Sequence, residues 1–259
     1  MLKKLLKYDF KLILQSMLPV YGISLALAIV SNIFLRINKL TPLFRIPSAF
    51  ITGLSIMLCI GIVFITFIIG MVNFYKQTVK DEGYLLHTLP VSKDSIIISK
   101  VTSVTVTSIL SIIVAVLAAI ITLNIAPNDV IEVIKTFIKG LQNYTLPVTL
   151  VIIAVFLGQI VNTLLMYTSI SFGQKHATNK LLYSIIYGVV IYNVTQIISA
   201  LIYVPLISNE KIMNALEQEI PPADILNIMM IITIAISLIT ITIYYLLTKR
   251  NLEKKLNLE

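Results

Sequence analysis

Six long stretches of the chain consist of apolar and uncharged polar residues, and short charged segments separate them. None of the six contains an Asp, Glu, Lys, Arg or His. A helix needs about 20 apolar residues to cross a hydrocarbon core of roughly 30 Å, and every stretch reaches that length. The pattern therefore predicts six transmembrane helices, at Leu12–Leu35, Ala49–Phe74, Val101–Ile125, Leu146–Ile170, Leu181–Ile207 and Ile225–Leu247.

Residues 1–14 have a charged side and an apolar side. At about 100° per residue, the four lysines of this segment fall within one arc, and leucine and isoleucine occupy the opposite side. This pattern predicts an amphipathic helix that lies in the membrane interface before the first span. Asp9 falls among the apolar residues, so we expect it either to form a local salt bridge or to face a partner protein.

The segment between the second and third spans is the most informative polar part of the sequence. Asp81 and the acid after it can begin a short helix, because carboxylates favour a helix N-terminus. Tyr84 and the two leucines after it present apolar groups, and Pro90 ends the turn. Ser92 is placed to cap the next helix, with Asp94 in its first turn. Exposed apolar groups of this kind mark an interface, although an ordinary turn between two spans is the alternative.

Composition agrees with an all-α membrane protein. Hydrophobic residues make up 58% of the chain, and charged residues make up 12%, against about 25% in a typical soluble domain. The segments between spans are too short for a second, soluble domain, so we expect residues 1–259 to form a single integral membrane domain. The lone Cys59 cannot form an internal disulfide, and we expect it to serve packing.

The distribution of basic residues predicts the orientation. Fourteen of the 20 Lys and Arg residues lie in segments on the N-terminal side, whereas the acids divide equally between the two sides. Cytoplasmic loops carry an excess of Lys and Arg, so we expect a multi-pass protein of the cell membrane with both termini in the cytoplasm. The net charge of +8 is spread over short segments next to the membrane, where lipid head groups account for it, and we expect no nucleic-acid partner.

The residue types of the spans argue against chemistry at membrane depth. Ion-driven transporters use ionisable groups inside the membrane, and these spans have none. The two histidines, His87 and His176, fall in loops, and the sequence lacks the G-x-x-x-x-G-K-[ST] phosphate loop. We therefore expect no enzymatic activity, no metal and no cofactor bound by this chain.

Amides and hydroxyls are the polar groups inside the spans. Two amide pairs are spaced three residues apart, so each pair shares a helix face. They either form hydrogen bonds between helices or line a substrate path. The hydroxyls of the third span suit close helix packing. The two amide pairs are Gln159 with Asn162, and Asn193 with Gln196.

The sequence resembles one transporter family in three places. The segment after the second span reads DEGYLLHTLPVSKDSIIISK (Asp81–Lys100), the loop after the fourth span reads MYTSISFGQKHATNK (Met166–Lys180), and the C-terminus reads YYLLTKRNLEKKLNLE (Tyr244–Glu259). These resemble the corresponding segments of permeases of the type-2 family of ATP-binding-cassette (ABC) transporters. With the six spans, the resemblance covers nearly the whole chain.

The resemblance implies a function and partners. In that family two permease subunits form the membrane pathway, and two ATPase subunits bind ATP and Mg and dock from the cytoplasm. It implies that residues 1–14 form a connecting helix, and that the segment between spans 2 and 3 contains a coupling helix that contacts the ATPase. The contact candidates are Asp81, Glu82, Gly83, Tyr84, Leu85, Leu86, His87, Thr88 and Leu89.

An exporter of apolar or amphipathic substrates fits the uncharged spans best, with a second permease subunit that is identical or paralogous. A non-transporting sensor or assembly scaffold, which uses the same segment as an adaptor site, is the alternative. A secondary transporter is disfavoured because nothing inside the spans could bind a coupling proton.

Overall fold

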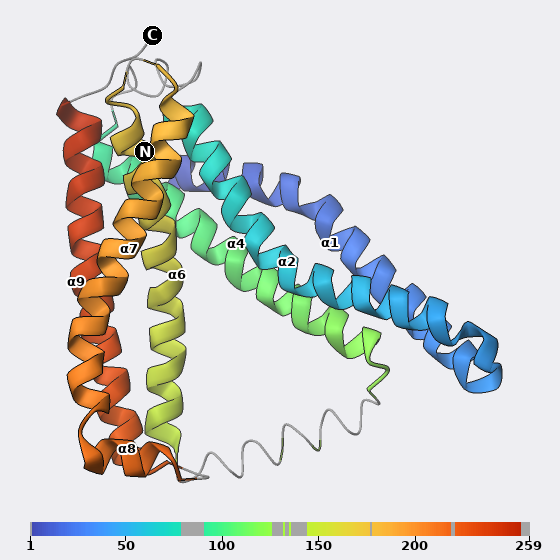
Figure 1. Ribbon diagram of the computed structural model, residues 1–259. Helices are drawn as coiled ribbons and strands as arrows, with labels where there is room; N and C mark the ends of the chain where they lie inside the picture. The colour runs from blue at the N-terminus through green and yellow to red at the C-terminus, as the bar shows by residue number, and fades with distance from the viewer. Residues whose placement is uncertain are drawn as a thin grey trace. The chain divides into compact units, whose positions relative to one another are not determined.

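The computed structural model describes residues 2–78, 91–125, 144–176, 178–218 and 221–254, together with Glu132 and Lys135. All regular elements of this described part are helices (Figure 1). Six are long and apolar enough to cross a membrane, as the sequence predicts. They are α1 (Leu2–Leu40), α2 (Arg45–Thr78), α4 (Lys93–Thr122), α6 (Thr145–Gly173), α7 (Lys180–Ile207) and α9 (Ala223–Lys254), and the short elements are η1 (Pro42–Phe44) and α8 (Glu210–Leu216).

The N-terminal region differs from the prediction. The sequence predicts an interfacial helix over 1–14 followed by a separate span, whereas α1 is one continuous helix of 39 residues. The physical reason is that no glycine or proline interrupts residues 2–18, so nothing ends the helix before the apolar stretch begins. Pro19 lies inside α1 without ending it. The charged start of α1 therefore continues directly into its membrane-spanning part.

The chain forms two compact units, and both α2 and α4 contribute to each of them. Unit 1 contains Met1–Asn73 and Ile98–Thr136, and unit 2 contains Phe74–Ile97 and Phe137–Glu259.

Small side chains bring the helices of unit 1 together. Ala28 of α1, Cys59 of α2 and Ala118 of α4 form one buried cluster, in which Cys59 serves packing as expected. Small residues let membrane helices approach closely, so van der Waals contacts between the helices stabilise their packing.

Hydroxyl groups bind the same three helices of unit 1 to one another. The Ser111 Oγ of α4 lies 2.7 Å from the Tyr21 hydroxyl of α1 and 2.6 Å from the Thr66 hydroxyl of α2. Ser55 of α2 and Thr122 of α4 form a similar pair with their hydroxyl oxygens 2.6 Å apart. The packing role predicted for hydroxyls of the third span is therefore confirmed at Ser111.

In unit 2, α6 packs against both α7 and α9. The rings of Phe74 and Tyr167 stack with centroids 3.9 Å apart, and both side chains are buried. The hydroxyls of Thr168 on α6 and Thr248 on α9 lie 2.9 Å apart. Polar side chains therefore join α6 and α9, while an aromatic pair fixes the end of α2 against α6.

Candidate functional site

The first residues of α4 directly follow the segment for which the sequence predicts a coupling helix. Ser92 caps α4 as predicted, since its Oγ accepts a hydrogen bond from the backbone N–H of Ser95 at 3.3 Å. The candidates Asp81–Leu89 lie outside the described residues, so their predicted contact with an ATPase stays a prediction.

In unit 1, the start of α4 is joined to α1 by an ion pair. Lys100 Nζ lies 3.3 Å from Asp9 Oδ1, and Ser99 Oγ donates to Asp9 Oδ2 at 2.7 Å. The two charged side chains are only 5% and 4% exposed. Asp9 is therefore paired, but its partner is 91 residues away, and the expectation of a local salt bridge was wrong. Because both charges are buried, their mutual attraction offsets part of the cost of removing them from water.

In unit 2, the start of α4 is joined to the end of α9. Lys249 Nζ lies 2.8 Å from Asp94 Oδ2, and the Tyr245 hydroxyl donates to Asp94 Oδ1. Asp94 and Lys249 lie beyond the ends of the charge-free segments, and about a third of each side chain is exposed. The hydrogen bond from Lys249 holds the pKa of Asp94 below its ordinary value, and the same bond raises the pKa of Lys249.

The two ion pairs share one helix. Asp94 and Lys100 both belong to the first turns of α4, and each pairs with a residue of a different helix, α9 or α1. A displacement applied to the chain before Ser92 therefore acts on a helix end that is bonded to two others. Each ion pair lies within one unit, Asp94–Lys249 in unit 2 and Asp9–Lys100 in unit 1.

The four amides of the spans were expected either to form hydrogen bonds between helices or to line a substrate path. Asn162, Asn193 and Gln196 are exposed on the surface of unit 2, and Asn193 Nδ2 donates to the carbonyl oxygen of Val189 in its own helix. Gln159 Oε1 is buried without a hydrogen-bond partner. Among the described residues none of the four bonds to another helix, so their role in a substrate path stays a prediction.

A cluster of aromatic rings lies where α6 connects to α7. The ring of His176 stacks on Tyr183 with centroids 3.6 Å apart, and His176 Nε2 lies 3.2 Å from the Tyr187 hydroxyl. The sequence contained a signal for this cluster, because Tyr183 and Tyr187 are four residues apart and share a helix face. Sequence reasoning missed the cluster because His176 is placed against them only by the turn after α6.

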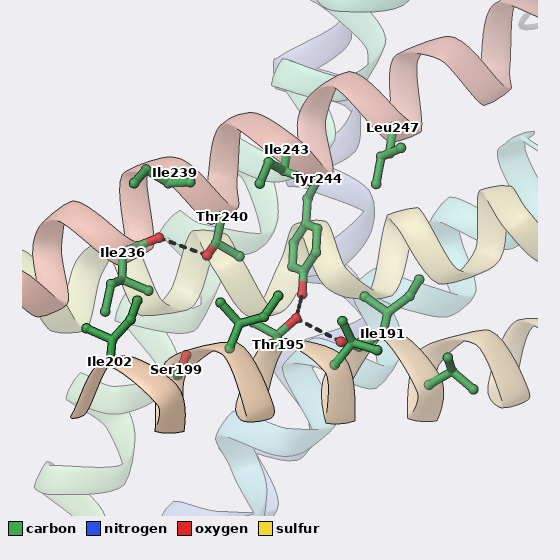
Figure 2. A pocket seen from close by; sticks show the side chains of 13 residues that line it. Ile191, Thr195, Ser199, Ile202, Ile236, Ile239, Thr240, Ile243, Tyr244 and Leu247 are labelled. Carbon is green, nitrogen blue, oxygen red and sulfur yellow. Dashed lines mark hydrogen bonds between the residues drawn. The ribbon is translucent and has the colours of Figure 1, made fainter. Parts of the chain in front are cut away.

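A groove of about 300 Å³ lies between α7 and α9 of unit 2, and nine of the 13 residues that line it are aliphatic (Figure 2). Tyr244 of α9 points across the groove and its hydroxyl bonds to that of Thr195 on α7. Thr195 and Thr240 also donate to carbonyl oxygens of their own helices, at 2.7 Å and 2.8 Å respectively. The lining residues are Val190, Ile191, Val194, Thr195, Ile198, Ser199, Ile202, Ile236, Ile239, Thr240, Ile243, Tyr244 and Leu247.

Within the described ranges, no three side chains of His, Cys, Asp or Glu lie close enough together to hold a metal ion. The fold defines the class: the chain is an all-helical, multi-pass membrane protein. Comparison of the chain with protein-family models, characterised proteins and solved structures gave no match.

Proposed function

We propose that this chain is the membrane-spanning permease subunit of an ABC transporter in the cell membrane, with both termini in the cytoplasm. It pairs with an identical or paralogous permease and exports an apolar or amphipathic substrate. The observation that carries the proposal is the pair of ion bridges at the start of α4, immediately after the segment that resembles a coupling helix.

The energy comes from outside the chain in this proposal. The charge-free spans hold no group for ion coupling, so two partner ATPase subunits bind ATP and Mg and dock on Asp81–Leu89. Closure of the ATPases moves the docked segment, and the movement passes into α4. The Asp94–Lys249 bridge carries it to α9, and the Asp9–Lys100 bridge carries it to α1. The helices then repack as rigid bodies and open the pathway.

The docking assignment is tested by a charged double substitution, Tyr84→Lys with Leu85→Glu, in the co-expressed complex. We expect the ATPase subunit to be lost on purification, together with its stimulation by the permease, because two apolar contacts are replaced by charges. Leu43→Glu is the matched control, because Leu43 lies in η1, far from the docking segment in sequence, and is 87% exposed. An intact, fully stimulated complex from the double variant would contradict the assignment.

A sensor or assembly scaffold is the second candidate, and one observation favours it. Asn162, Asn193 and Gln196 are exposed, so these three amides do not converge on a path within unit 2. Reconstitution distinguishes the two functions: nucleotide-dependent movement of an amphipathic dye in liposomes supports the transporter. A complex that binds partners but moves no dye supports the scaffold.

A further inference from the structure

We propose that the groove between α7 and α9 holds one acyl chain of a membrane phospholipid, whose phosphate group binds Arg250. The inference concerns a lipid site within unit 2, and it does not depend on whether the chain belongs to an ABC transporter.

The groove has the chemistry and the length for one acyl chain. It lies in charge-free segments of α7 and α9, and the hydroxyl groups of Thr195 and Tyr244 already bond to each other. From Val190 to Ile202 the wall formed by α7 is about 18 Å long at 1.5 Å per residue. Half of a hydrocarbon core of roughly 30 Å is about 15 Å, so the groove spans one leaflet.

A cationic side chain continues the α9 wall beyond the end of the groove. Ile236, Ile243 and Arg250 are spaced seven residues apart, which places them on one stripe of the helix. Arg250 is exposed, whereas Lys249 next to it is bonded to Asp94. A guanidinium group matches phosphate geometry with two parallel hydrogen bonds, so Arg250 is suited to the lipid phosphate.

Aromatic rings continue the α7 wall at the same end. Tyr187 and Tyr183 precede Val190 by three and seven residues, which places them on the stripe that faces the groove. The contacts of His176 with both rings hold them in place. Tyrosines favour the level of the head groups, where an apolar ring meets a polar hydroxyl. The end of the groove near Leu247 therefore lies at the membrane surface.

A phospholipid supplies both groups that this surface requires, a hydrocarbon chain and an adjacent negative charge. A second copy of the chain is the competing occupant. Its charge-free stretches offer aliphatic side chains, and its acids lie in the segments that flank them. A phospholipid carries its phosphate directly beside its hydrocarbon chain, as the position of Arg250 beyond the end of the groove requires, and this favours the lipid.

The test is native mass spectrometry of the full chain in detergent micelles, titrated with palmitoyl-oleoyl phosphatidylglycerol. We expect one tightly held lipid per chain. Ser199→Phe fills the groove and should lower lipid occupancy at least tenfold. Ile197→Phe is the matched control, since Ile197 is 61% exposed on α7 and does not line the groove, and it should keep the lipid. Arg250→Gln should weaken binding about fivefold, the contribution of one basic residue near a lipid phosphate.

Equal occupancy in Ser199→Phe and Ile197→Phe would overturn the proposal. So would a change of oligomeric state in Ser199→Phe alone, measured by light scattering, because it assigns the groove to a second copy. If Ser199→Phe does not fold, Arg250→Gln decides, because Arg250 is exposed and its replacement leaves the helix intact. Unchanged affinity in that variant would then contradict the phosphate contact.

Discussion

The carboxylate of Asp9 is bonded to Lys100, a residue 91 positions further along the chain, with Nζ and Oδ1 3.3 Å apart. Ser99 supplies a second hydrogen bond to the same carboxylate. Both charged groups are buried, so this ion pair joins α1 and α4 inside unit 1. This bridge places Asp9 in the interior of unit 1, while Lys7 of the same helix is exposed.

Removing one partner of this bridge should lower the free energy of unfolding far more than replacing both partners by apolar residues. Asp9→Ala removes the carboxylate that faces the buried ammonium group of Lys100, and we expect the free energy of unfolding to fall by about 3–5 kcal/mol. The double variant Asp9→Leu with Lys100→Met replaces the pair by apolar groups and should recover most of the loss. Denaturation of the purified protein measures both.

The control for this experiment is Lys7→Ala, which removes an exposed charge from the same helix and should leave stability unchanged. An Asp9→Ala variant as stable as this control would show that the bridge contributes nothing.

The bridge between Asp94 and Lys249 should matter for coupling more than for stability. Both side chains are about one-third exposed, and exposed ion pairs stabilise proteins little. We expect Lys249→Gln to leave the melting temperature unchanged and to reduce stimulation of the partner ATPase severalfold. Lys39→Gln, at the exposed end of α1, is the control for loss of a positive charge. A variant that melts earlier but keeps full stimulation would assign the bridge a structural role only.

Two glycines of α6 should respond to alanine in opposite directions. A Cβ at Gly173 would lie 2.0 Å from Ser184 Oγ and 2.7 Å from the Ser184 backbone nitrogen, so α7 would have to move away. We expect Gly173→Ala to cost about 1–3 kcal/mol of stability. Nothing lies within 4 Å of a Cβ at Gly158, so Gly158→Ala should stabilise by roughly 0.5–1 kcal/mol. Thermal unfolding compares the two, and equal shifts would contradict the close approach of α6 and α7.

The predicted orientation can be checked with single cysteines in a Cys59→Ala background. Lys3→Cys and Glu253→Cys should react with an impermeant maleimide only after the cells are permeabilised. Ser208→Cys, at the opposite end of α7, should react in intact cells, because Ser208 is exposed beyond the last turn of the helix. Labelling of Lys3→Cys in intact cells would place the N-terminus outside and overturn the positive-inside prediction.

The helices were predictable because their signal is local. Each span is a long uncharged stretch, and the cap at Ser92 follows from the residue type before α4. Residue types also indicated helix packing for the hydroxyls of α4. The partners of individual side chains were not predictable. The sequence placed Asp9 among apolar neighbours, yet the choice of Lys100 depends on how α1 and α4 are aligned.

The sequence alone determined that this chain is a helical, multi-pass membrane protein. Each of the six stretches is long and apolar enough to cross the bilayer, and a single segment that crosses it satisfies its backbone hydrogen bonds as a helix. Only the tertiary structure revealed the ion pairs of α4, the stacking of His176 on Tyr183 and the groove between α7 and α9. The ion pairs join residues far apart in the sequence, the stacking depends on the turn after α6, and the groove depends on the spacing of whole helices. Helix periodicity says which residues share a face, but only packing decides what that face meets.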